Sequence, residues 1–292
     1  MSVLSTSPQR RRWLSRLPLQ LLLAAGVLLL LAPATNASGF TYGCDWRHLA
    51  QVAGHLSTLT PKRPVVYLLG GSAARECTIS DDSWRAAVRE AGGPDTLAYN
   101  LGASGQTYED NLVLIEKLPR VPSIVIIGVI VGRYTRTGAR GLPDVEPGIA
   151  PYPQHRFTQR GIRTDAVKRF LVTDWLTRRY PVFQDRFPRQ AQKLDALVAR
   201  CIELGFHPVM LNLPLNLQIV EDRLDQPRRR YREHCQAVAT KYDVPWVNWL
   251  PTIPLVSRDF SDNWHLVESG RVKWQRRLTT LTVTTLRRYD ME

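Results

Sequence analysis

Three short polar segments, far apart in the chain, contain residue types that together could carry out nucleophilic chemistry. They are "GGSAARE", "NLGASGQT" and "DNWHL", which contain Ser72, Gly102 with Gln106, and Asp262 with His265. A serine hydroxyl becomes a nucleophile when a base takes its proton, and histidine suits that task near neutral pH. An aspartate three residues before the histidine can orient the imidazole. The pattern predicts acyl transfer through a triad of Ser72, His265 and Asp262.

The same segments predict where a substrate would be held. Gly102 has no side chain to block a substrate, so its backbone N–H and that of Ser72 are the expected oxyanion donors. Gln106 and Arg133 are the predicted substrate-binding side chains. Each segment alone has an ordinary structural explanation, such as a serine N-cap or a turn glycine. Their combination is what indicates a catalytic site.

The segments lie between elements that alternate along the chain. Apolar runs typical of strands occupy residues 63–69, 95–101, 123–131, 207–214 and 244–249, and amphipathic runs typical of helices occupy 80–92, 107–118, 188–205, 221–242 and 268–289. This alternation predicts a three-layer α/β/α sandwich with a flavodoxin-like parallel five-stranded sheet. Because ligands bind at the carboxyl ends of such strands, the three segments are expected to meet at that edge.

Two stretches do not follow the alternation. Residues 1–38 contain a basic segment, an uncharged apolar run and then Ala32 and Ala34, which is the pattern of a secretory signal peptide. An uncleaved N-terminal membrane anchor is the alternative, and both predict that the domain at 39–292 is extracytoplasmic. Residues of about 134–165 are rich in Gly, Pro and Arg and are predicted to form an irregular insertion.

Composition and cysteine spacing limit the function further. The net charge of +13 is explained by solvated surfaces or by attraction to an anionic envelope polymer or membrane, while export argues against nucleic acid. The four cysteines lack a C-x-x-C pair, so a zinc or redox site is not expected. Disulfides Cys44–Cys77 and Cys201–Cys235 are expected, with buried free thiols as the alternative. No phosphate-binding or dinucleotide-binding glycine motif is present, and no cofactor or metal is predicted.

With these motifs in view, the chain resembles the SGNH hydrolases, a branch of the GDSL esterases and lipases. "LLGGSAARE" is similar to the first block of the family, with Gly71 in place of its aspartate. "NLGASGQT" is similar to the second block, with Gly102 as the oxyanion donor, and "DNWHL" is similar to the last block. The third block of the family usually supplies an asparagine, which "IGVIVGRYT" lacks, and Arg133 is the residue that could donate in its place.

The resemblance and the leader together imply an extracytoplasmic serine esterase. It would remove O-acyl groups, acetyl first among them, from a cell-envelope or extracellular saccharide without a cofactor. Two alternatives stay open from the sequence. One is an O-acyltransferase that uses the same triad, and the other is a catalytically degenerate module that binds a glycan or a partner protein.

Overall fold

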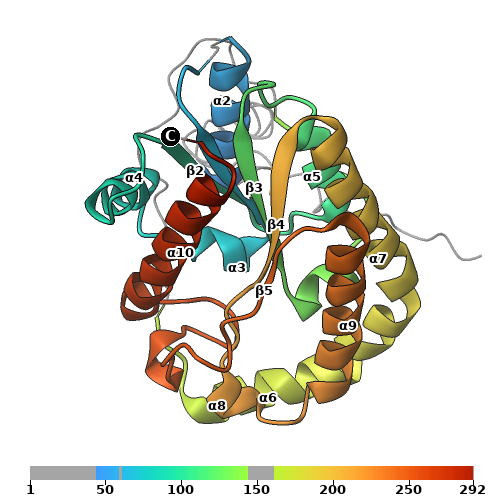
Figure 1. Cartoon of the computed structure of the whole chain (residues 1–292). Coiled ribbons are helices and arrows are strands. Elements are labelled where there is room, and N and C mark those ends of the chain that lie inside the picture. Colours follow the sequence, from blue (N-terminus) through green and yellow to red (C-terminus); the bar gives the residue numbers. More distant parts are fainter. Residues whose placement is uncertain (1–43, 59–60, 144–160, 292) are drawn as a thin grey trace, which may run out of the picture. The chain divides into compact units, whose positions relative to one another are not determined.

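A computed structural model describes residues 44–58, 61–143 and 161–291 of the chain. Within these residues five strands form one parallel sheet in the order β2-β1-β3-β4-β5, with helices on both faces (Figure 1). The predicted three-layer sandwich is confirmed, and the strand order is that of flavodoxin-like folds. The strands are β1 (Val65–Gly70), β2 (Leu97–Gly102), β3 (Ser123–Val129), β4 (Phe206–Asn212) and β5 (Trp246–Val247).

The central strands explain why the sheet is parallel and covered. Every residue of β1 and β3 is buried. A strand buried on both faces is apolar throughout, as the sequences of β1 and β3 are. The expected strands are all found, although β5 is shortened to two residues.

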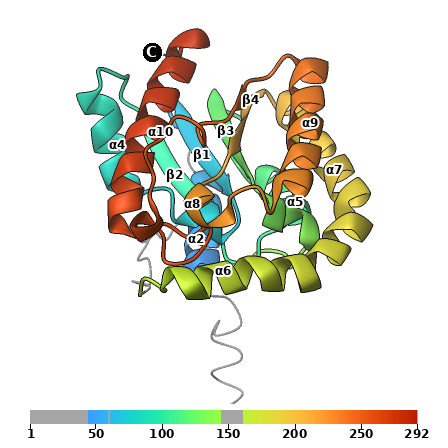
Figure 2. The ribbon, with the colours of Figure 1, turned by 90° about the horizontal axis from the view of Figure 1, so that it is seen from below.

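Helices α4 (Asp81–Glu90) and α10 (Glu268–Arg288) cover one face of the sheet, and α5 (Tyr108–Ile115), α7 (Tyr180–Glu203) and α9 (Asp225–Tyr242) cover the other (Figure 2). Side-chain caps define where α4 and α5 begin. Ser80 accepts a hydrogen bond from the Ser83 N–H, and Thr107 does the same for Asp110. Pro227 lies in the first turn of α9, where proline is tolerated, so it does not kink the helix.

Several helices were not expected from the sequence. They are α2 (Cys44–Ser57), α3 (Ser72–Arg75), α6 (Asp165–Asp174), α8 (Leu217–Val220) and a π-helical turn, η4 (Trp175–Arg179), which continues directly into α7. The predicted start of the third helix at residue 188 is wrong, because Pro188 lies inside α7. The apolar face of the added turns, with Phe183 and Phe187, packs on Tyr134 of the short helix η3 (Val131–Thr135).

Other expectations concern chain segments that the structure describes only in part. The predicted leader at 1–38 lies outside the described residues, and so does most of the insertion, whose described ends are residues 134–143 and 161–165. None of the helices in the described part of the chain is long and apolar enough to cross a membrane.

The expected disulfides are not formed. Cys77, Cys201 and Cys235 are buried free thiols, which was the alternative left open by the sequence. The Cys77 thiol donates to the Ala73 carbonyl oxygen at 3.3 Å. Burial raises the pKa of Cys201 and of Cys235 to about 12. Buried free thiols of this kind pack as small side chains in the interior.

Candidate active site

The local structure around Ser72 places its hydroxyl at the carboxyl end of the sheet. Strand β1 ends at Gly70, and Ser72 is the first residue of the short helix α3, with Gly71 as its N-cap. Ser72 is half-buried, whereas Ala73, Ala74 and Arg75 behind it are buried. The turn therefore holds α3 in the protein and leaves the serine at the surface.

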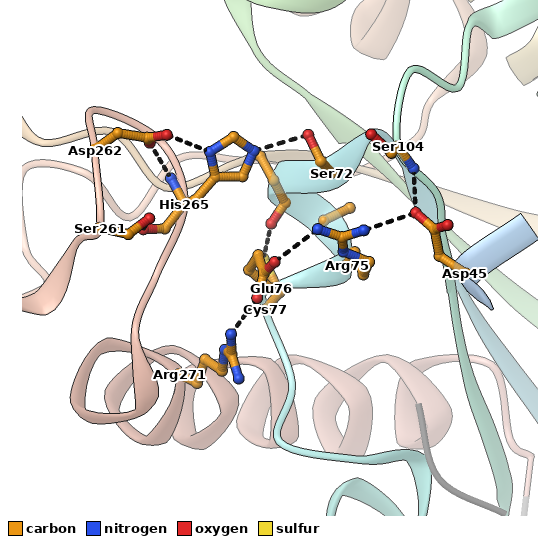
Figure 3. Close-up of polar contacts among 12 residues, drawn as sticks. Asp45, Ser72, Arg75, Glu76, Cys77, Ser104, Ser261, Asp262, His265 and Arg271 are labelled. Carbon is orange, nitrogen blue, oxygen red and sulfur yellow. Dashed lines mark hydrogen bonds and ion pairs between the residues drawn. The ribbon is translucent and has the colours of Figure 1, made fainter. Parts of the chain in front are cut away.

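The structure brings the three predicted triad residues together (Figure 3). The Nε2 atom of His265 lies 2.8 Å from the Oγ atom of Ser72, although the two residues are 193 positions apart in the chain. The Nδ1 atom of His265 lies 2.7 Å from Oδ2 of Asp262. Both residues come from the loop between β5 and α10, which crosses the edge where β1 ends. This is the arrangement in which a serine, a base and an orienting carboxylate can act in sequence.

The surroundings of Asp262 keep its carboxylate charged. Its Oδ1 atom accepts hydrogen bonds from the backbone N–H groups of Trp264 and His265, each at 3.0 Å. Burial alone would raise the pKa of Asp262, but the hydrogen bond and charge of His265 and the two N–H groups lower it to about 2. At neutral pH Asp262 is thus an anion that can stabilise an imidazolium.

The structure contradicts the prediction that Gly102 is an oxyanion donor. The Gly102 N–H donates to Oδ1 of the buried Asn100 at 3.0 Å. A Cβ atom at position 102 would lie 2.5 Å from the backbone nitrogen of Arg75. Gly102 therefore lets α3 pack closely on β2. The amide of Asn100 holds the same helix by donating to the Ala74 and Arg75 carbonyl oxygens at 3.0 and 3.2 Å.

Gly105, in the same segment, occupies the place expected of Gly102. Ser72 and Gly105 both line a cavity of about 220 Å³. Among the described residues, no acceptor binds the backbone N–H of either. Gly105 has a φ of +76°, a conformation that favours glycine. Gly102 and Gly105 look equivalent in the sequence, so the sequence alone does not tell which of the two lines the cavity.

The two predicted substrate-binding residues, Gln106 and Arg133, both line this cavity. The Oε1 atom of Gln106 accepts from the Ala103 N–H at 3.0 Å, and its Nε2 has no partner in the described part of the chain. Arg133 is only 3% exposed, donates from Nη1 to the Gly128 carbonyl oxygen at 2.7 Å and lies 4.0 Å from the ring centre of Tyr108. Its Nε and Nη2 have no hydrogen-bond partner in the described part of the chain, and like Nε2 of Gln106 they are almost fully buried.

The cavity also contains residues that sequence reasoning missed. These are Trp175 and Arg179 from the π turn, Trp264 from the triad loop, and Ile130, Thr135 and Arg136 after β3. The π-helical turn places an aromatic ring and a guanidinium in the same cavity, and such turns occur often at functional sites. The residues that the structure describes contain no cluster of three His, Cys, Asp or Glu side chains that could hold a metal ion.

A buried network of charges supports α3 from behind (Figure 3). Arg75 bonds to Asp45 of α2 at 2.8 Å and to Glu76 at 2.9 Å, and Glu76 also binds Arg271 of α10. Glu76 is fully buried, and the other three residues are at most 9% exposed. Asp45 also accepts from the Ser104 N–H, which links the network to the segment that carries Gly105.

We expect Arg75→Met to destabilise the protein by about 3–5 kcal/mol, because it leaves the buried carboxylates of Asp45 and Glu76 without their shared partner. Urea unfolding followed by circular dichroism measures this change. Arg63→Met is the matched control, since the ion pair of Arg63 with Asp95 is exposed and should contribute about 0–1 kcal/mol. Equal effects of the two substitutions would contradict a structural role for the network.

We expect Gly105→Ala to lower kcat for ester hydrolysis by about 100-fold, because a positive φ disfavours alanine and a displacement near 1 Å beside the reacting atoms can have that effect. Gly141→Ala is the control. Gly141 has the same φ of +76°, but nothing lies within 4 Å of its Cβ position. Steady-state kinetics on a chromogenic acetate ester compares the two. Similar losses in both variants would mean that backbone strain alone lowers the activity.

No protein-family model and no curated protein matches this chain. Among solved structures it is similar to a lipase/acylhydrolase from Enterococcus faecalis, at 16% identity over 77% of this chain and 95% of that chain, with a TM-score of 0.43. It is similar to the acetylxylan esterase Axe2 from Geobacillus stearothermophilus, at 12% identity over 75% and 93% of the two chains, with a TM-score of 0.49. It is also similar to a member of the lipolytic protein G-D-S-L family from Veillonella parvula, at 12% identity over 76% and 98% of the two chains, with a TM-score of 0.45. At this level of likeness, the chemistry of the chain has to be inferred from its own residues.

Proposed function

We propose that the protein is a serine esterase of the SGNH type that removes O-acyl groups, acetyl first among them, from a saccharide. The observation that carries this proposal is the continuous set of contacts from Asp262 through His265 to the Ser72 hydroxyl, which opens onto a cavity. Serine, histidine and aspartate in this geometry form the triad of covalent acyl transfer on many unrelated folds.

The contacts define the order of the reaction. The Oγ atom of Ser72 attacks the ester carbonyl carbon while Nε2 of His265 takes the hydroxyl proton. Asp262 stabilises the resulting imidazolium. The proton then passes from His265 to the oxygen of the leaving alcohol, and the ester C–O bond breaks to give an acyl-serine. Water, deprotonated by His265, attacks that intermediate, and the acid and the free serine are released.

The negative charge that develops on the carbonyl oxygen needs donors in the same cavity. We infer that the backbone N–H groups of Ser72 and Gly105, which line the cavity and have no acceptor among the described residues, provide them. Arg133, which also lines the cavity, is the proposed donor in place of the family asparagine. Loss of one such donor commonly lowers the rate by about 10²–10³.

The size and lining of the cavity support a small acyl group on a sugar. A volume of about 220 Å³ lies below the usual range for drug-sized ligands. Trp175 and Trp264 line the cavity, so a sugar bound there would contact their indole rings. The extracytoplasmic location is supported by the leader pattern in residues 1–38.

A fluorophosphonate probe and an acetylated oligosaccharide test the proposal together. We expect the probe to label Ser72 in the full chain, to lose that label in His265→Ala, and acetate to be released from the oligosaccharide. Absence of labelling in folded protein would favour the non-catalytic binding module instead. Transfer of acetyl to an added acceptor sugar, in preference to water, would replace the esterase with an O-acyltransferase.

A further inference from the structure

The cavity at Ser72 continues into a second cavity that is rich in arginine. The second cavity has a volume of about 350 Å³ and shares four lining residues with the first, namely Gly105, Thr135, Arg136 and Arg179. Arg140 and Arg186 line the second cavity, and Arg133 lines the first. Among the described residues that line the two cavities, none is acidic.

Two of these arginines, Arg136 and Arg179, lack a carboxylate partner within the described part of the chain. Neither Arg136 nor Arg179 forms an ion pair with a described carboxylate, whereas Arg178, the neighbour of Arg179, pairs with Asp174 at 2.9 Å. Burial lowers the pKa of Arg136, and the positive charges of Arg140 and Arg179 lower it further. A cluster of like charges with that property is stabilised when an anion binds to it.

The guanidinium groups converge on the backbone beside the nucleophile. A Cβ atom at Gly105 would lie 2.8 Å from Nη1 of Arg136 and 2.9 Å from Nη2 of Arg140. A second, independent observation comes from the cavity floor. Arg133, only 3% exposed, lines the first cavity together with Gln106, and its guanidinium lies 4.0 Å from the ring centre of Tyr108. The two cavities therefore gather several arginine side chains beside Ser72, with no acidic side chain among their described lining residues.

We propose that the saccharide acted on is anionic, and that Arg136 and Arg179 bind a carboxylate or phosphate group next to the acylated position. This inference rests on the proposed function and adds the substrate class to it. Planar guanidinium groups match the paired oxygens of both anions. Trp175 and Arg179 come from one π turn, so a sugar face and its anionic group can be recognised side by side.

Binding to a chain that cannot turn over keeps the test independent of catalysis. In Ser72→Ala, calorimetry compares a deacetylated oligouronate, a phosphorylated oligosaccharide and a neutral oligosaccharide of equal length. We expect at least one anionic ligand to bind about 10- to 100-fold more tightly than the neutral one, as charge-assisted hydrogen bonds would give. The tighter of the two anions identifies the group, and its affinity should fall with added salt.

Substitution at the arginines locates the binding. Arg136→Gln and Arg179→Gln should each lower the affinity for the preferred anionic ligand by about 10-fold. Arg178→Gln, on the same turn but paired with Asp174, should leave that affinity unchanged. Equal affinity for the neutral oligosaccharide, equally tight binding of inorganic phosphate, or equal effects of Arg178→Gln and Arg179→Gln would overturn the proposal. Anion binding in a chain that shows no esterase activity would leave this inference standing and remove only the proposed reaction.

Discussion

Replacing Ser72 with alanine is expected to lower kcat for an acetate ester by about 10⁵- to 10⁶-fold, the scale seen when a triad nucleophile is removed. The Oγ atom of Ser72 is the atom that Nε2 of His265 contacts at 2.8 Å, and the substitution removes it without disturbing the backbone of α3. Steady-state kinetics at saturating ester measures the change. Ser104→Ala is the matched control, because Ser104 makes its described contacts with Asp45 and Trp46 through the backbone.

Combining His265→Ala with Ser72→Ala tests whether the two residues act as one catalytic unit or independently. His265→Ala alone should lower kcat nearly as much as Ser72→Ala does. The double variant should lower kcat little further, because the two side chains act as a unit. If the fold-loss of kcat in the double variant equalled the product of the two single losses, Ser72 and His265 would act independently. Activity within about tenfold of the wild type in Ser72→Ala would place the nucleophile elsewhere.

Asp262→Asn is expected to lower kcat by about 10⁴-fold while leaving the fold intact. The Oδ1 atom of Asp262 accepts two backbone N–H groups, so the amide oxygen of an asparagine must take that position. Its NH₂ group then faces Nδ1 of His265, which has to become an acceptor. The proton moves to Nε2, and that atom can no longer accept the Ser72 proton. Kinetics with circular dichroism as a folding check tests this, and a loss below tenfold would contradict the orienting role.

The same substitution should change how stability depends on pH. The pKa of Asp262 is lowered to about 2 in the folded protein, against about 3.9 in an unfolded chain. Its contribution, about 2 kcal/mol, is fully present above the unfolded value and is lost as pH falls towards 2. Urea unfolding between pH 6 and pH 2 should therefore show that the free energy of unfolding falls less with decreasing pH in Asp262→Asn than in the wild type. Parallel curves would mean that the pKa of Asp262 is not lowered by folding.

Local sequence was enough to predict the five strands, five of the helices and the residues of the proposed triad. The uninterrupted apolar run of β3 predicts a strand covered on both faces, because side chains of a strand point alternately to the two faces and here both are apolar. Asp262 and His265 could be paired from the sequence, since a spacing of three residues brings both side chains to one turn. Ser72 could be placed at a strand end because the apolar run stops at Gly70 and Gly71.

Only the tertiary structure decided which groups meet at the cavity. Gly102 and Gly105 are indistinguishable as letters, and the difference arises because the Asn100 side chain binds the N–H of Gly102 once the chain is folded. No sequence pattern predicts that Arg136 and Arg179 line the same cavity. They come from separate segments, and a π turn rotates Arg179 into the cavity. The same holds for the cysteines: a disulfide needs two thiols facing each other, and in the folded chain Cys201 and Cys235 are separate buried thiols.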